Sequence, residues 1–438
     1  MAAEVTSWGR YPRVSGQREH PLTWTGEPLP APPPGGSLLP RGQGRSYGDA
    51  CLNADGTLLT TARLDRFLDF DPATGVLRCE AGVTLDAILR LVTGQGWFLP
   101  VVPGTRFVSV GGAIANDVHG KNHVRAGTFG RHVRRFELVR SDGSRRVCSL
   151  EEHRDWFEAS VGGLGLTGLI TWAELQLRRV NNPYLLQETV AFSRLEDFLT
   201  LARESSRDFE YTVAWVDSLA RGRHLGRGLF HRAHHAPPRF DAPPRAPADR
   251  AGLAVPFDFP GIALNPVSVT AFNALYALRR PQGPVHYEPY FFPLDGVPRW
   301  NRIYGRAGLL QFQCVVPPDA AGVAALREIL DRGAHSGLPS FLTVLKTYGD
   351  VPSPGWLSFP RAGYSLALDF PNRGERTFAL LDELEAVTRA AGGRLYPAKD
   401  ARMSPETFAA CYPAHERLER YRDPAFSSSF WRRVHGAR

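Results

Sequence analysis

The sequence predicts an α+β fold in two parts that meet near residue 180. Up to that residue, polar loops rich in glycine recur between short strand-like segments. Beyond it, helix-length segments alternate with longer strand-like segments, a pattern that favours a sheet layered with helices. The chain has 438 residues, of which 43% are hydrophobic and 22% charged. That length and composition are typical of a globular protein with two or three domains.

The N-terminal part opens with coil and short strands. Residues 11–40 are rich in Pro and Gly, which predicts an extended arm on the surface. Alternation over 56–61 predicts a strand. Residues 67–82 predict a hairpin, because the stretch 71–75 between its two halves consists of turn-forming residues.

A helix and a second hairpin follow. Residues 85–93 carry apolar side chains at helical spacing, Thr84 is a suitable N-cap, and Gly96 would end the helix. Residues 136–147 predict a hairpin that turns at the polar stretch 141–144.

A glycine-rich turn at 161–170 contains the pattern G-x-G-x-x-G at Gly163, Gly165 and Gly168. A dinucleotide-binding fingerprint needs a helix that opens within this pattern. Residues 169–177 instead alternate as a strand. The strand favours the other interpretation, a turn that packs against a ligand or another strand.

The part beyond residue 180 shows no internal repeat. Residues 236–250 are rich in Pro and predict an exposed loop. We expect helices over 195–204, 320–332 and 375–391, and strands over 309–316, 340–348 and 364–370.

The net charge of +8 comes mostly from arginine. It indicates either an anionic partner, such as a phosphate-bearing cofactor, a phosphorylated substrate or a membrane surface, or simply an arginine-rich genome. The basic residues are dispersed without zinc-finger spacing or a basic-region heptad, which argues against nucleic-acid binding. No apolar run is long enough to span a bilayer. The first eight residues lack the features of a signal peptide, so we expect a cytoplasmic protein.

The cysteines and histidines show no metal-site pattern. His119 and His123 have the spacing of a zinc pair, but no third ligand is evident, so no metal is expected. No C-x-x-C pair occurs, which argues against a disulfide framework and a structural zinc site. We expect packed thiols at all five cysteines, which are Cys51, Cys79, Cys148, Cys314 and Cys411.

The stretch 102–130 is the most informative part of the chain. It holds six glycines, and its polar residues stand between short apolar runs, which is unusual for a linker. Glycine lets a bound group approach the backbone closely, so the stretch predicts a cofactor-binding loop. A second polar loop at 41–49 would offer consecutive backbone N–H groups to an anion. The polar residues of the first stretch are Thr105, Asn116, Asp117, His119, Lys121, Asn122 and His123.

Near the C-terminus, the segment 393–400 places Lys399 between a small residue and Asp400. Such a lysine is either functional or merely solvated, and its spacing does not decide between the two.

Three of these segments together resemble FAD-dependent oxidases of the vanillyl-alcohol oxidase superfamily. They are R-G-Q-G-R-S-Y-G-D at 41–49, P-G-T-R-F-V-S-V-G-G-A-I-A-N-D-V-H-G-K-N-H at 103–123 and Y-P-A-K-D-A-R at 396–402. The likeness covers most of the chain. It implies a PCMH-type FAD-binding domain of two subdomains at 1–180. It further implies an inserted α+β substrate domain with an antiparallel sheet at 181–393, similar to arabinonolactone oxidases, and a return to the FAD domain at 394–438.

The resemblance also implies which residues hold FAD. Many relatives attach the flavin covalently through a His at the place of Arg45, so we expect non-covalent FAD here. The implied cofactor-binding residues are Arg41, Gly42, Gln43, Gly44, Arg45, Ser46, Tyr47, Gly48, Asp49, Gly104, Ser109, Val110, Gly111, Gly112, Asn116, Asp117, His119, Ile170 and Tyr396.

The implied reaction is oxidation of a secondary alcohol, in which hydride leaves the carbinol carbon and a base removes the hydroxyl proton. Lys399, Tyr47 and His119 are the implied catalytic residues, with Lys399 as either base or positioning group. Each also has a purely structural interpretation: His119 as a loop residue, Trp215 as core, and the two glutamines as a cross-strand pair. The implied substrate-binding residues are Lys121, Trp215, Gln311, Gln313, Lys346 and Lys399.

Two departures from the family pattern stand out. A pocket-strand Cys of the family is Ala367 here, so thiol-directed inactivation at that position is not expected. The helix that usually follows the N-terminal W-G-R motif is also missing, because Trp8, Gly9 and Arg10 lead directly into the Pro-rich arm. One flank of the FAD domain is therefore trimmed.

Three functions stay open at this point. The leading hypothesis is an oxidase of a polyprenyl-phosphate pentose, which oxidises the ribose 2′-OH to a ketone and works with a separate NAD-dependent reductase. Peripheral membrane contact is compatible with such a substrate. The alternatives are an aldonolactone or alditol oxidase of a small soluble polyol, and a non-catalytic flavin-binding partner protein.

Overall fold

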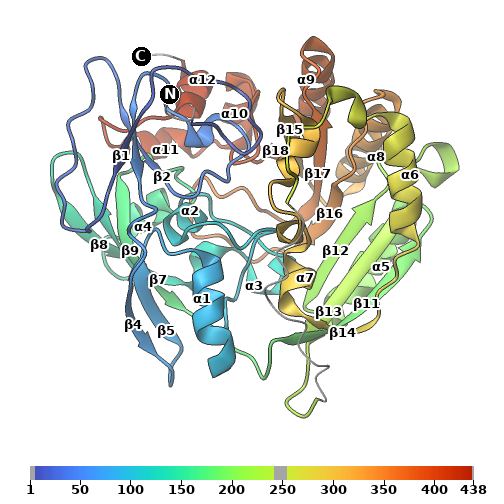
Figure 1. Ribbon diagram of the computed structural model, residues 1–438, viewed down its shortest axis with the longest axis horizontal. Coiled ribbons are helices and arrows are strands. Elements are labelled where there is room, and N and C mark those ends of the chain that lie inside the picture. The colour runs from blue at the N-terminus through green and yellow to red at the C-terminus, as the bar shows by residue number, and fades with distance from the viewer. Residues whose placement is uncertain (1–4, 241–253, 437–438) are drawn as a thin grey trace.

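The short alternating segments of the N-terminal half form two small sheets. The computed structural model describes residues 5–240 and 254–436, and these sheets make up the left lobe in Figure 1. One sheet has the order β1-β3-β2 with parallel pairing, and the other is antiparallel with the order β4-β5-β9-β7-β8. The strands are β1 (Arg18–Pro21), β2 (Leu38–Arg41), β3 (Thr57–Thr60), β4 (Phe67–Asp71), β5 (Val76–Glu80), β7 (Val133–Val139), β8 (Arg145–Ser149) and β9 (Leu169–Gln176).

Both predicted hairpins are present in the five-stranded sheet, and the predicted helix packs beside it. Helix α1 (Leu85–Val92) begins at Thr84, whose side chain accepts a hydrogen bond from the Ala87 amide. A further helix, α2 (Val110–Ala115), forms inside the glycine-rich stretch, because Ser109 caps it by accepting a hydrogen bond from the Gly112 amide. The other short elements of this lobe are β6 (Trp97–Phe98), α3 (His123–Ala126), α4 (Arg154–Ser160) and β10 (Arg178–Arg179).

The turn at 161–170 leads into strand β9, so the dinucleotide fingerprint is wrong and the packed turn is correct. Gly168 (φ 142°) lies very close to strand β7, which pairs with β9. A Cβ on Gly168 would meet the Val139 backbone oxygen at 2.6 Å. A side chain at this position would separate the turn from the sheet.

The second half builds an antiparallel eight-stranded sheet, the right lobe in Figure 1, in the order β14-β11-β13-β12-β16-β17-β15-β18. All three predicted strands are present. The strands are β11 (Tyr184–Phe192), β12 (Tyr211–Val216), β13 (Gly228–His235), β14 (Gly283–His286), β15 (Leu309–Val316), β16 (Thr343–Tyr348), β17 (Gly363–Pro371) and β18 (Arg394–Leu395).

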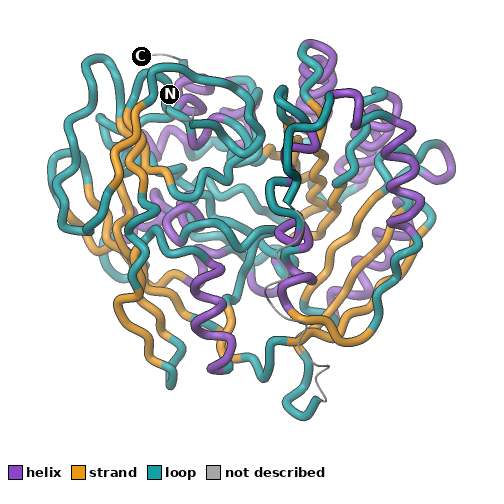
Figure 2. Tube along the Cα trace, viewed as in Figure 1, coloured by secondary structure: helices purple, strands orange, loops and turns teal. Residues whose placement is uncertain are grey.

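Three helices cover one face of this sheet. They are the three helices that the sequence predicts, each extending close to its expected range, and their apolar sides form the largest buried core of the molecule. The opposite face looks toward the first lobe, and Figure 2 shows that mostly loops fill the space between. The covering helices are α5 (Leu195–Asp208), α8 (Ala320–His335) and α9 (Glu375–Ala390), while α6 (Pro266–Ala277) and α7 (Tyr287–Phe291) lie on the other side.

After β18 the chain crosses back to the first lobe. Three short helices follow there. Phe426 forms a bridge with Leu38 of β2, and Arg433 pairs with Asp49 at 2.8 Å. These last helices are α10 (Pro405–Cys411), α11 (His415–Glu419) and α12 (Ser429–His435).

Two further expectations concern the rest of the chain. All five cysteines are buried free thiols, as predicted. Within residues 5–240 and 254–436, no helix is long and apolar enough to cross a membrane. The predicted loop at 236–250 lies largely outside the described residues.

Candidate active site

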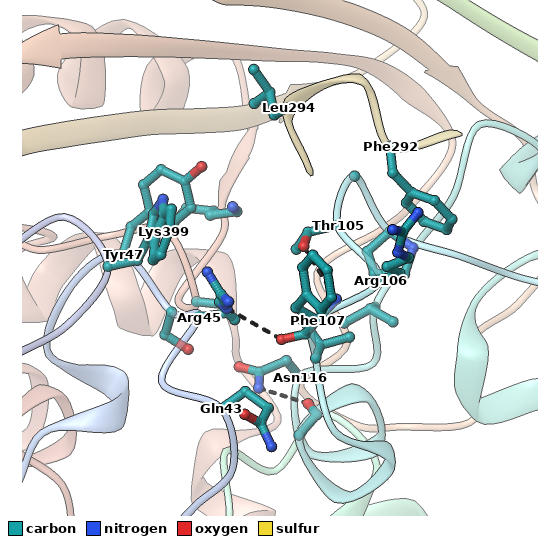
Figure 3. A pocket seen from close by; sticks show the side chains of 18 of the residues that line it. Gln43, Arg45, Tyr47, Thr105, Arg106, Phe107, Asn116, Phe292, Leu294 and Lys399 are labelled. Atoms are coloured by element: carbon teal, nitrogen blue, oxygen red, sulfur yellow. Dashed lines mark hydrogen bonds between the residues drawn. The ribbon is translucent and has the colours of Figure 1, made fainter. Parts of the chain in front are cut away.

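One cavity of about 1240 Å³ lies between the two lobes. It exceeds the roughly 300–1,000 Å³ of most small-molecule sites, so it offers room for a large cofactor together with a substrate. Two surfaces enclose most of it. We call the loops 41–47 and 103–119 the glycine wall, and the cavity-facing residues of β12, β15, β16 and β17 the sheet wall. Figure 3 shows part of the cavity from close by.

The glycine wall brings the two loops of the sequence motif face to face. A Cβ on Gly42 would lie 2.1 Å from the Ser109 hydroxyl oxygen, so the loops approach too closely for a side chain there. Gly104 has no atom within 4 Å of its Cβ position, which leaves open space beside the backbone. Such a wall admits a bulky group up to the main chain.

Most of the residues implied by the resemblance line this cavity, including all of the implied catalytic and substrate-binding ones. Those that line it are Arg41, Gly42, Gln43, Gly44, Arg45, Ser46, Tyr47, Gly104, Ser109, Gly111, Gly112, Asn116, His119, Lys121, Ile170, Trp215, Gln311, Gln313, Lys346, Tyr396 and Lys399. Four implied residues lie outside its lining: Gly48, Asp49, Val110 and Asp117.

Gly48 and Asp49 join the first loop to the C-terminal segment. A Cβ on Gly48 would lie 1.7 Å from the Asp400 backbone oxygen. Asp49 and Asp400 both pair with Arg433, each at 2.8 Å. These contacts position the residues before Gly48 against those before Asp400.

Val110 and Asp117 are buried behind the glycine wall. Val110 belongs to the apolar core of the first lobe. Asp117 accepts hydrogen bonds from the Gly130 amide (2.8 Å) and the Ser358 hydroxyl (2.5 Å). Burial raises the pKa of the Asp117 carboxyl to about 6, although these hydrogen bonds oppose the shift. Asp117 thus ties the His119 loop to a loop of the second lobe.

Lys399 and Tyr47 meet at one end of the cavity. The Lys399 ammonium nitrogen lies 3.5 Å from the centre of the Tyr47 ring, and Figure 3 shows the two side chains together. The Tyr47 amide donates to the Ala398 carbonyl at 2.9 Å. Within the described part of the chain, the Lys399 ammonium forms no ion pair and donates no hydrogen bond, so it is available to a ligand.

The buried carboxylate of Asp369 lies close to this pair, and the sequence interpretation missed it. Asp369 is opposite Gln311 in the β15–β17 register, and the Gln311 amide donates to one of its oxygens. Its other oxygen has no hydrogen-bond partner within the described residues. A single acidic residue within the apolar segment 364–370 was the signal that could have revealed it.

Lys399 and Asp369 influence each other's protonation. Burial lowers the pKa of Lys399; the charge of Asp369 opposes this shift and Lys346 adds to it. Burial raises the pKa of Asp369, while the Gln311 hydrogen bond and the Lys399 charge oppose that rise. The two groups therefore titrate as a pair, and Lys399 loses its proton more easily than a solvated lysine.

His119 lies at the centre of the cavity wall among aromatic rings. Its Nε2 lies 3.1 Å from the Gln313 amide nitrogen, and the Tyr348 ring centre is 5.1 Å away. Burial, together with the neighbouring charges of Lys346, His123 and Lys399, lowers the pKa of His119 well below its usual value. The imidazole is therefore neutral at pH 7.

The region around His119 is rich in cations. Lys121 donates to the backbone oxygens of Tyr290 and Phe291 at 2.6 and 3.0 Å. The Lys346 ammonium has no hydrogen bond or ion pair with any described residue, and burial lowers its pKa to about 8. Neither lysine has a carboxylate partner among the residues that the structure describes. This end of the cavity therefore favours an anionic group of a ligand.

Strand alternation explains the sheet wall. Gln311 and Gln313 share one face of β15, and Ala367 faces the same side from β17. Trp215 of β12 lies against Tyr276, with ring centres 4.7 Å apart. No side chain of this wall comes from the glycine motifs.

Arg45, one of the implied cofactor-binding residues, is fixed in the cavity wall. Its Nε donates to the Phe107 carbonyl at 3.2 Å, and its guanidinium lies 4.4 Å from the Trp8 ring centre. Figure 3 shows the hydrogen bond. The sequence interpretation gave no binding role to some other lining residues, because the motif spacing drew attention to glycines. They include Arg106, Phe292, Leu294 and Asp295.

The chain resembles known flavoproteins. Residues 34–149 match the FAD binding domain family. The chain is 35% identical over 425 residues to decaprenylphosphoryl-beta-D-ribose oxidase of Mycolicibacterium smegmatis, covering 91% of this chain and 89% of that protein. It is 38% identical over 376 residues to an uncharacterized protein of Streptomyces coelicolor (80% and 100% covered). It is 25% identical over 225 residues to L-gulonolactone oxidase 3 of Arabidopsis thaliana (50% and 35% covered).

Proposed function

The chain belongs to the family of FAD-dependent oxidases that includes decaprenylphosphoryl-beta-D-ribose oxidase, and from this premise we propose that it oxidises the ribose 2′-hydroxyl of a polyprenyl-phosphate pentose. The protein is an FAD-dependent oxidoreductase that acts on CH–OH groups. The substrate is the proposal, and its strongest support is the cation-rich end of the cavity beside Lys399.

The residues of the cavity fit FAD. The close approach at Gly42 and the open space beside Gly104 let a bulky group reach the main chain, and the backbone N–H groups of residues 42–46 donate to no acceptor among the described residues, so they can meet a pyrophosphate. The loop 41–47 and the residues Ser109, Gly111, Gly112 and Asn116 would hold the cofactor. Bound FAD supplies the acceptor for the hydride that leaves the carbinol carbon.

The anionic part of the substrate has a matching set of charges. Lys346 has an unpartnered ammonium in the cavity. Burial lowers the pKa of Lys121 well below its usual value, and repulsion from the charge of Lys346 lowers it further. A phosphate between the two lysines would relieve this repulsion. A neutral polyol would leave it in place.

In this proposal, Lys399 accepts the proton of the substrate hydroxyl. Its lowered pKa makes the neutral amine available near neutral pH, so it is suited to accept the proton. Tyr47 covers the ammonium with its ring. Asp369, buried behind Gln311, would stabilise the protonated lysine that results.

Anaerobic mixing of the FAD-loaded protein with polyprenylphosphoryl ribose tests the substrate. We expect bleaching of the visible flavin absorbance by this substrate, and none by free ribose, alditols or aldonolactones at the same concentration. Bleaching by the soluble polyols alone would instead support an aldonolactone or alditol oxidase, which the likeness to L-gulonolactone oxidase 3 favours. Absence of bleaching by every alcohol would favour a non-catalytic flavin-binding partner.

Lys399→Ala tests the assigned role. We expect flavin reduction to slow by about 10²- to 10⁴-fold while FAD stays bound. Gly94→Ala is the matched control, because its Cβ would meet no atom within 4 Å and it lies outside the cavity. Undiminished reduction by Lys399→Ala would contradict the proton-accepting role.

The FAD is proposed to bind non-covalently, since Arg45 occupies the place of the flavin-linked His. Acid precipitation should therefore release all yellow colour into the supernatant. Colour that stays on the protein pellet would overturn this. To complete an epimerisation, the keto product would need a separate NAD-dependent reductase, whose addition with NADH should convert the product to the epimeric alcohol.

A further inference from the structure

Helix α6 carries mostly apolar side chains and no charged one, yet it lies at the surface of the second lobe (Figure 1). The apolar side of a helix in a globular protein normally faces the core. Here Val269 and Asn273 are buried, whereas Val267 and Leu275 are 79% and 68% exposed. One face of the helix thus has no partner among the described residues.

The exposed apolar residues form one continuous stripe. Val267, Ala271, Leu275 and Leu278 recur at intervals of three or four residues, so they share the outward face. Leu278 is 77% exposed, and Ile262, just before the helix, is 79% exposed. The stripe runs about 16 Å along the helix axis.

The inward face of α6 belongs to the active-site cavity. Tyr276 lines the cavity and packs on Trp215 of the sheet wall at 4.7 Å between ring centres. The Asn273 amide donates to Asp217 at 2.6 Å. The same helix therefore borders the substrate site on one side and presents bare apolar surface on the other.

The charged residues closest in sequence to the stripe have one sign. Residues 259–287 contain no Asp or Glu, and their only charged side chains apart from His are those of Arg279 and Arg280. Both are exposed and directly follow the stripe. Two exposed arginines beside an apolar stripe match the negative surface potential of an anionic bilayer.

We propose that the outward face of α6 binds the surface of an anionic lipid bilayer. Leu275 and Leu278 enter the boundary between headgroups and acyl chains, while Arg279 and Arg280 contact lipid phosphates. The benefit to the reaction rests on the proposed function: a polyprenyl-phosphate sugar reaches the cavity past Tyr276 without leaving the bilayer.

Vesicle flotation with the FAD-loaded protein tests the surface. We expect binding to vesicles of phosphatidylcholine with phosphatidylglycerol, and weaker binding to phosphatidylcholine alone. Leu275→Ser with Leu278→Ser should lower the vesicle-bound fraction by more than about tenfold. Arg279→Gln with Arg280→Gln should remove the preference for phosphatidylglycerol.

The matched control is Leu68→Ser with Leu150→Ser, two leucines of the first lobe that are 42% and 44% exposed. This control should bind vesicles as the wild type does, and all variants should keep their FAD and melting temperature. Absence of wild-type binding, or equal binding by the α6 serine variant, overturns the inference. A wild-type dimer that the serine variant turns into a monomer, with vesicle binding unchanged, would instead identify a second copy as the occupant.

The two proposals fail separately. Vesicle binding that depends on α6 supports the inference even where polyprenylphosphoryl ribose does not bleach the flavin, a result that overturns the proposed substrate alone. Bleaching of the flavin by the substrate in detergent, without binding of the protein to vesicles, overturns only the inference that α6 binds a bilayer.

Discussion

The two walls of the cavity present different chemistry. The glycine wall offers mainly backbone, because close approaches such as that of Gly42 to Ser109 leave no room for side chains. The sheet wall offers side chains, including Gln313 and Lys346, on strands that are far apart in the sequence. A backbone wall suits a cofactor that never changes, whereas a side-chain wall sets which substrate is accepted.

Where the two walls meet, contacts between single residues fix the position of one wall relative to the other. Tyr47 from the glycine wall touches Lys399, and Asp117 behind it binds Ser358 of the second lobe. The comparison therefore makes a prediction about each kind of position. Substitutions at the junction should lower the rate of catalysis most. Substitutions within the glycine wall should affect only the binding of the cofactor, and those within the sheet wall only the binding of the substrate.

After Lys399→Ala, the largest effect is expected for Gly48→Ala at the junction. The new Cβ would lie 1.7 Å from the Asp400 backbone oxygen, so the loop that carries Tyr47 must move away from Lys399. A displacement of about 1 Å lowers turnover by about 100-fold. Stopped-flow flavin reduction measures this, with Gly94→Ala as the control. Normal turnover by Gly48→Ala would show that the contact between Tyr47 and Lys399 does not matter for the reaction.

The second effect concerns stability at Asp117. Its pKa is raised from 3.8 to about 6 in the folded state, so the folded protein holds a proton that the unfolded chain has lost between these values. Stability from this group is therefore complete below about pH 4 and declines as the pH rises to about 6, by about 3 kcal/mol in all. Asp117→Asn should remove this decline.

The measurement for Asp117 is urea unfolding of the FAD-loaded protein from pH 4 to 7. The difference in unfolding free energy between the wild type and Asp117→Asn should change from about pH 4 to about pH 6 and stay constant from there to pH 7. A difference that does not vary with pH would mean that Asp117 is already ionised in the folded state at pH 4.

The glycine wall and helix α1 could be predicted from the sequence because their signals are local. Gly42 beside a polar run and Thr84 as a cap are recognisable from neighbouring residues alone. The lone acidic residue in 364–370 marks Asp369 as unusual, but its role could not be predicted in this way, because that role depends on the pairing with Gln311 across two strands. Arg433 is 384 residues from its partner Asp49, and no local pattern reveals such a contact.

A smaller effect is expected for the pH dependence of the sheet wall. Asp369 raises the pKa of Lys399 and Lys346 lowers it. Because neutral Lys399 accepts the proton, Asp369→Asn should move the acidic limb of the kcat/KM profile to lower pH, and Lys346→Gln should move it to higher pH. Shifts in the same direction for both variants would contradict an electrostatic origin. An unmoved limb in both would assign it to another group.

The smallest effect is expected in the wild type itself, when it is treated with N-ethylmaleimide. All five cysteines are buried, and burial raises the pKa of Cys51, the one that lines the cavity, so activity should persist. Ala367→Cys should place a thiol on the sheet wall and make the enzyme sensitive, while its FAD content stays unchanged. Ala173→Cys, in the buried strand β9 away from the cavity, should behave as the wild type does. Loss of FAD from Ala367→Cys would mean that the sheet wall also holds the cofactor. The assignment of the cofactor to the glycine wall alone would then be wrong.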